Sequence, residues 1–130
     1  MATEVLVNDG GAPARILPFT AGSALTAGRV VDMNTDGTVD HCASGTKYCL
    51  GAAFVDANSG ANCSIITGRG VILNLAVSGS GAAIEEGETL VVDNEGDGVM
   101  VSGGTAGSVV AVALEAQTSG TSSMIKCMLI

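Results

Sequence analysis

The most constraining feature of this sequence is a succession of short apolar and β-branched runs, each ending in a cluster of Gly, Asn, Asp or Ser. This pattern is typical of short β-strands joined by tight turns. In the clearest run, 71–77, four apolar residues alternate with Ile72, Asn74 and Ala76, as on the two faces of one strand. No helical period persists long enough to compete. The nine runs that predict strands are 29–33, 38–42, 47–55, 62–67, 71–77, 89–93, 99–102, 108–116 and 124–130.

Nine short strands with turns between them predict an all-β fold, either a compact antiparallel β-barrel or a β-sandwich. A chain of 130 residues is the size of one domain. Turn and linker residues at 8–13 separate the start of the chain, so we expect an extended N-terminal arm over 1–15 and a single β domain over 16–130. The arm packs either on a neighbouring subunit or on its own domain. We expect removal of 1–11 to leave the body folded.

Two hairpin regions of the sequence resemble each other. Val30-Val31-Asp32 precedes the turn 34–37, and Val91-Val92-Asp93 precedes the turn 94–98. Both turns contain Asn, Asp and Gly, which tolerate the positive φ of hairpin loops. An internal duplication explains the match, and so do two hairpins that arose independently.

The composition indicates a surface covered by protein. Hydrophobic residues make up 47% of the chain and charged residues only 14%, where a soluble domain has about 25% charged residues. The longest apolar run, 109–114, is far shorter than the roughly 20 residues of a spanning helix, so we expect no membrane partner. Residues 1–11 lack a signal-peptide pattern, which predicts synthesis in a cytoplasm. We therefore expect the apolar surface to be covered by self-association or by a protein partner.

The charge balance argues against nucleic acid as a partner. There are 13 acidic and 5 basic residues, and the net charge of −8 repels phosphate backbones. The aromatic residues, Phe19, Tyr48 and Phe54, are too few for a base-stacking surface.

Catalytic and zinc chemistry find little support in the residue pattern. His41 is the only histidine, and its neighbour Cys42 points to the opposite face of a strand, so the two cannot form a nucleophile and base pair. We therefore predict that the protein is not an enzyme and has no cofactor. The four cysteines lack the paired spacing of a zinc site, and we interpret them as reduced, buried thiols: Cys42, Cys49, Cys63 and Cys127.

One acidic turn resembles a calcium loop. Residues 32–37 match the first six positions of an EF-hand loop, but position twelve is Ala43, where a bidentate carboxylate is required. A hairpin turn explains the segment better. We predict no metal site, and a metal-binding β domain is the less favoured alternative.

Several apolar motifs, at 14–22, 25–31 and 110–116, followed by a Gly/Ser turn and a terminal apolar strand, resemble the small capsid cement proteins of tailed bacteriophages. The resemblance covers about 14–130. It implies a β-rich homotrimer on the outer surface of the virion capsid, where it binds the major capsid protein and stabilises the head. Another virion β module, a head fibre or tail component, is the alternative.

Contacts with the capsid or with another subunit are expected in two places. The arm can add an extended segment to a partner through backbone hydrogen bonds. The second place is the motif at 14–22, which is one of the motifs that resemble the capsid cement proteins. The predicted contact residues are Glu4, Val5, Leu6, Val7, Ile16, Leu17 and Phe19.

Overall fold

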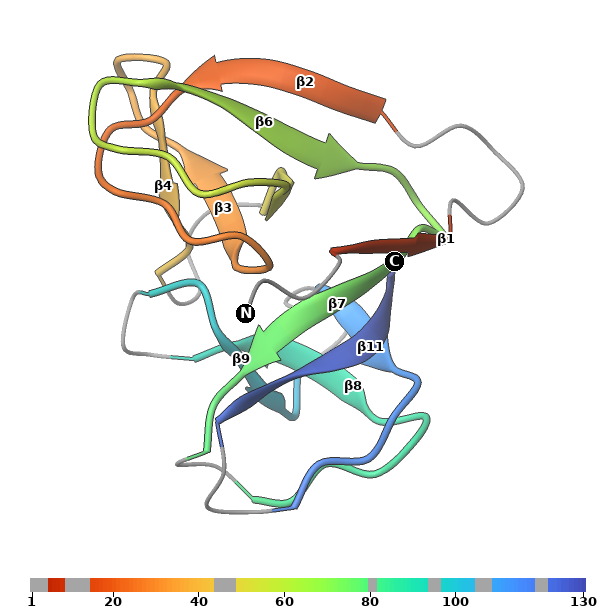
Figure 1. Ribbon diagram of the computed structural model, residues 1–130. Coiled ribbons are helices and arrows are strands. Elements are labelled where there is room, and N and C mark those ends of the chain that lie inside the picture. Colours follow the sequence, from red (N-terminus) through yellow and green to blue (C-terminus); the bar gives the residue numbers. More distant parts are fainter. Residues whose placement is uncertain are drawn as a thin grey trace.

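The computed structural model describes residues 5–8, 15–43, 49–79, 82–93, 97–104, 109–118 and 122–130. Within these ranges the chain forms eleven β-strands in two sheets, which lie one above the other in Figure 1. The predicted all-β class is confirmed. None of the described residues forms a helix long and apolar enough to cross a membrane.

The sheet at the top of Figure 1 has five strands. Their spatial order is β2 (Arg15–Thr20), β6 (Asn62–Thr67), β5 (Gly51–Ala53), β3 (Val30–Met33) and β4 (Val39–His41). The lower sheet has six strands. Their order is β1 (Leu6–Asn8), β7 (Ile72–Val77), β11 (Ser123–Leu129), β10 (Ala111–Ala113), β8 (Thr89–Val92) and β9 (Met100–Ser102).

Two details differ from the sequence prediction: the number of strands, and whether the sheets close into a barrel. Strands β3 to β11 fall on the nine predicted runs, and β1 and β2 are additional. Each sheet curls until two strands that are not neighbours in this order meet at a single parallel residue pair. The pairs are Val77 of β7 with Met100 of β9, and Ala21, directly after β2, with Val39 of β4. Because one pair is not a continuous ladder, the chain does not form a closed barrel. The other strand pairings are antiparallel.

The two sheets repeat one topology. The order β2-β6-β5-β3-β4 becomes β7-β11-β10-β8-β9 when each strand is replaced by its counterpart. The match extends to loops: the Gly28 amide donates to the Ala53 carbonyl as the Gly87 amide donates to the Ala113 carbonyl, and these glycines have φ of 84° and 87°. Similarity over whole sheets favours the internal duplication. We call 15–67 the N-terminal repeat and 71–130 the C-terminal repeat.

A shared hydrophobic core joins the two repeats. Val30, Ala52 and Ile66 of the N-terminal repeat are fully buried in one cluster with C-terminal residues such as Leu73 and Leu90. A second cluster, which includes Val31, Ala53 and Ile65, lies within the N-terminal repeat. Alternate residues of β3, β5 and β6 therefore point to different cores, because successive side chains in a strand face opposite sides.

Among the described residues, strand β1 has no counterpart in the N-terminal repeat. It pairs with the edge of β7, with Leu6 opposite Leu73. The Asn74 amide donates to the Val5 carbonyl at 2.6 Å, and the Val5 side chain is buried in the shared core. Of the two placements left open for the arm, the structure shows packing on the chain's own sheet for residues 5–8.

One cysteine pair departs from the sequence prediction. Cys42 and Cys49, with Cα atoms 6.4 Å apart, form a disulfide. The prediction of four reduced thiols is wrong for this pair, because sequence spacing does not report which cysteines lie side by side. Cys63 and Cys127 are free and buried. Burial, with a smaller contribution from Glu115, raises the pKa of Cys127 to about 12, so it is an unreactive thiol.

Candidate interaction surface

Strand β2 is an exposed edge strand with apolar side chains. In the part of the chain that the structure describes it pairs with β6 alone, from Arg15 opposite Thr67 to Thr20 opposite Asn62. Ile16 is 51% exposed and Leu17 is 39% exposed. A long apolar edge strand that lacks a cover is a characteristic site of association with another chain.

The free backbone edge of β2 is interrupted by a proline. The Ala21 amide donates to the Ala61 carbonyl in continuation of the β2–β6 register. Since hydrogen-bonded and outward-facing residues alternate in an antiparallel ladder, Ile16, Pro18 and Thr20 direct their backbone groups outward. Proline has no N–H, which is tolerated at this position of an edge strand. It also weakens the edge as a template for another strand.

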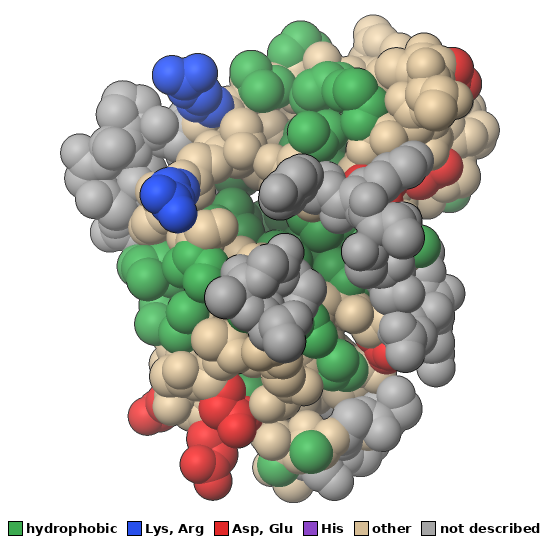
Figure 2. All heavy atoms as spheres, turned by 180° about the vertical axis from the view of Figure 1, so that it is seen from behind, with side chains coloured by type: hydrophobic (Ala, Val, Ile, Leu, Met, Phe, Trp, Pro, Cys, Tyr) green, Lys and Arg blue, Asp and Glu red, His purple; other side chains and the backbone are tan. Residues whose placement is uncertain are grey.

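Two arginines lie at the start of this strand. Arg15 and Arg69 are exposed, and Arg15 pairs with Thr67, two residues before Arg69. Among the described residues neither forms an ion pair, whereas Arg29 pairs with Asp97 and Lys126 with Glu115. Figure 2 shows Lys and Arg side chains beside hydrophobic ones near the top of the molecule, with acidic side chains at its bottom and right. The β2 corner is thus basic and apolar within an acidic protein.

The predicted contact residues are distributed over two strands. Ile16, Leu17 and Phe19 all lie on β2, where Phe19 is partly buried against the N-terminal core. Val5 is buried, and Leu6 and Val7 belong to β1, where only their backbone is described. Glu4 lies outside the described residues. Sequence reasoning did not identify Arg15 and Arg69, because their lack of an acidic partner depends on the fold.

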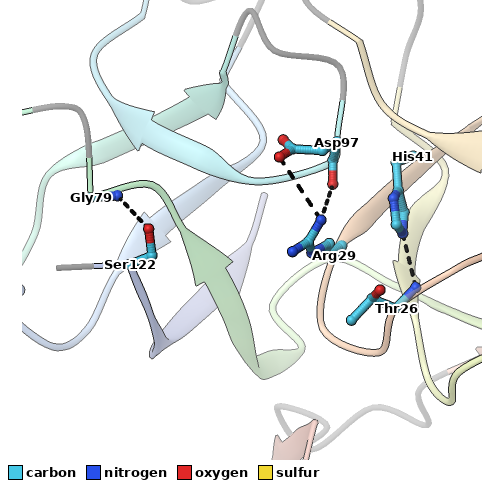
Figure 3. A network of polar contacts seen from close by, with 6 residues as sticks. All are labelled: Thr26, Arg29, His41, Gly79, Asp97 and Ser122. Atoms are coloured by element: carbon cyan, nitrogen blue, oxygen red, sulfur yellow. Dashed lines mark hydrogen bonds and ion pairs between the residues drawn. The ribbon is translucent and has the colours of Figure 1, made fainter.

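A groove of about 320 Å³ lies where the two repeats meet, lined by Thr26, Arg29, Asp97, Ser122, Met124 and neighbouring residues. The Arg29 guanidinium donates to the Asp97 carbonyl at 3.2 Å and lies 3.9 Å from its carboxylate. Figure 3 shows this contact between the repeats, with the Gly79 amide donating to Ser122 nearby. The ion pair joins residues 68 positions apart, so no local sequence signal could have predicted it.

The single histidine has a structural role beside this groove. The Thr26 amide donates to Nε2 of His41 at 3.0 Å (Figure 3), which requires the lone pair of a neutral ring. Burial and the nearby Arg29 charge lower the pKa of His41, against the opposite effects of Asp97 and Asp40. Its neighbour Cys42 is held in the disulfide.

We expect acidification to destabilise the protein through His41. Because its folded pKa lies below the ordinary value of 6.5, the unfolded chain takes up the proton first. The stability contributed by neutral His41 is therefore present above about pH 6.5 and declines as the pH falls through the window below it. Melting curves between pH 7 and 5 should show this decline, and His41→Gln should flatten it. An equal decline in His41→Gln would assign the effect to the carboxylates.

The acidic turn that resembles a calcium loop forms hydrogen bonds within its own hairpin. Asp36 accepts from the amide and hydroxyl of Thr38 at 3.0 and 2.7 Å, and these bonds lower the pKa of Asp36. Asn34 donates to the Asp40 carboxylate at 2.8 Å. In the part of the chain that the structure describes, no three His, Cys, Asp or Glu side chains gather as a metal site would require. The arrangement agrees with a hairpin turn.

Comparisons with known proteins agree with a virion origin. The sequence profile of the phage cement protein family matches residues 11–129. Among solved structures, the chain is similar to the N base of head fiber gp8.5 of bacteriophage phi29, with a TM-score of 0.68 and 18% sequence identity. The alignment covers 91% of this chain and 95% of that chain, and at this identity it shows the fold alone. No curated protein matches the sequence.

Proposed function

Because the chain belongs to the phage cement protein family and is thus a structural component of a phage virion, we propose that it binds the outside of the assembled head and cements major capsid subunits. The observation that carries the proposal is the exposed strand β2, with Ile16 at 51% and Leu17 at 39% exposure. Apolar side chains on an edge strand favour burial against a protein lattice. The proposal assigns no catalysis and no cofactor.

We further propose that the protein acts as a homotrimer. The excess of apolar residues and the low charged fraction of 14% suit a surface buried between subunits. Several copies held together would also contact several capsid subunits at once, which raises the overall affinity without new contacts on each copy.

Heads that lack this protein provide the test. Added wild-type protein should bind them and raise the temperature at which they release DNA. The variant Ile16→Asp should bind at least about 100-fold more weakly, because it places a charge in the proposed contact. Val55→Asp is the matched control, since Val55 is 44% exposed but follows β5. Failure of wild-type protein to bind any head form would contradict the proposal.

A head-fibre base is the second candidate, favoured by the similarity to the phi29 head fiber N base. Both candidates place the protein on the head, but only cementing has to stabilise it. Binding that leaves the temperature of DNA release unchanged would favour the fibre base.

A further inference from the structure

One row of side chains contributes to the contact between the two repeats, beside the Arg29–Asp97 ion pair. Val30, Ala52 and Ile66 are cross-strand neighbours on β3, β5 and β6, and each is fully buried in the shared core. We call them the inner row. The N-terminal repeat thus covers the C-terminal repeat with the face that carries this row.

The C-terminal repeat carries the counterparts of this row on its own sheet, where Val112 and Met128 take the places of Ala52 and Ile66 and the exposed Thr89 takes the place of Val30. Val112 lies opposite Met128, and Met128 lies opposite Ile72, in the register that joins Ala52, Ile66 and Ile16 in the other repeat. We call Val112, Met128 and Ile72 the outer row. All three are partly exposed rather than buried. The neighbouring Leu114 and Ile130 are 37% and 47% exposed, and Lys126 on the same face pairs with Glu115. The face is therefore largely apolar and has no cover within the described residues.

The surface that the inner row covers also has a counterpart, which is partly exposed among the described residues. Leu73 lies opposite Cys127 as Leu17 lies opposite Ile65, which makes Leu17 the counterpart of Leu73. Leu73 is fully buried in the shared core, but Leu17 is 39% exposed. Arg15, Leu17 and Thr67 share one face of the N-terminal repeat, because Arg15 pairs with Thr67 and Leu17 is two residues further along β2. We call these three residues the open side.

We infer that the outer row of one copy packs on the open side of the next copy, in the way the inner row packs within one chain. The Leu17 side of β2 is therefore occupied by a second copy of this chain, which leaves Ile16, on the opposite face of the strand, for the capsid. This refinement rests on the proposed virion function. The contact is head-to-tail, and such contacts close into a ring when the rotation between copies allows it.

Charge and backbone chemistry agree with this contact. The open side carries Arg15, with Arg69 nearby, whereas exposed Glu85 and Glu86 precede Thr89, which pairs with Val112 at one end of the outer row. Opposite charges therefore flank the two surfaces. Pro18 stands in the place of Asn74, whose amide bonds the Val5 carbonyl. Because proline lacks this donor, side-chain packing rather than strand addition forms the contact.

Two charged variants test the inference without heads. Leu17→Asp disables the open side, and Met128→Asp disables the outer row. Wild-type protein and Val55→Asp should be oligomers by light scattering at tens of micromolar. Each single variant should self-associate at least about 100-fold more weakly and remain a folded monomer by its melting curve. Ile130→Asp, at a 47% exposed position beside the outer row, serves if Met128→Asp fails to fold.

Mixing the variants tests the head-to-tail geometry. Leu17→Asp keeps an intact outer row and Met128→Asp keeps an intact open side, so an equimolar mixture should form 1:1 dimers. A monomeric wild type, an oligomeric Leu17→Asp variant, or a mixture that stays monomeric would each overturn the inference. Binding to heads is measured separately, so a wild-type oligomer that ignores heads would overturn the proposed function and leave this contact standing.

Discussion

Replacing Gly51 by Ala is expected to lower the melting temperature by about 10 °C or more, which corresponds to roughly 3 kcal/mol for a chain of this size. A Cβ at Gly51 would overlap the backbone carbonyl oxygen of Ile66. That carbonyl cannot move aside easily, because Ile66 is fully buried and lies between Ala52 and Ile16 in the sheet. Calorimetry of the purified variant gives the measurement.

Two variants separate this close approach from other effects of glycine. Gly37 has a φ of 85° with open space around its Cβ position, so Gly37→Ala should cost only about 1 kcal/mol of backbone strain. Ala111 occupies the position equivalent to Gly51, and Ala111→Gly should cost about 0.5–1 kcal/mol. A Gly51→Ala protein that melts within about 2 °C of wild type would mean that β5 and β6 can separate.

Val5→Asp is expected to destabilise the protein by at least about 3 kcal/mol. Val5 is only 6% exposed and belongs to the core that joins the two repeats. The variant loses apolar burial and places a carboxylate where water does not reach. Urea denaturation curves measure the change in the free energy of unfolding.

Val55→Asp provides the control here too, since a charge at a 44% exposed position should change stability by less than about 0.5 kcal/mol. Removal of residues 1–11 deletes Val5 and β1 together, so the truncated protein should also melt at a lower temperature. Unchanged stability of both Val5→Asp and the truncated chain would instead indicate the independent arm that the sequence suggests.

These expectations locate stability and binding in different strands. Strand β1 covers the edge of β7 and contributes Val5 to the core. The equivalent edge in the N-terminal repeat is β2, whose Ile16 and Leu17 are exposed. Substitutions on β1 should therefore act through folding, whereas those on β2 should act through association.

Local patterns of the sequence predicted the all-β class and the positions of β3 to β11. A strand can be predicted from a few residues of sequence, because its side chains alternate between two faces. The match between Val30-Val31-Asp32 and Val91-Val92-Asp93 was also visible, but it was too short to distinguish a duplication from two similar hairpins. The strand pairing shows the duplication in another register, in which Val30 and Val31 correspond to Thr89 and Leu90.

What the sequence determined by itself was the strand composition, the turns and an apolar excess that calls for a protein partner. The tertiary structure decided which surfaces are covered. Leu17 and Leu73 lie in similar runs, Ile-Leu-Pro-Phe and Ile-Leu-Asn-Leu, yet Leu17 is 39% exposed and Leu73 is fully buried. The tertiary structure also decided the disulfide between Cys42 and Cys49 and the ion pair between Arg29 and Asp97. All of them depend on which strands become neighbours, and period-two alternation carries no information about strand order.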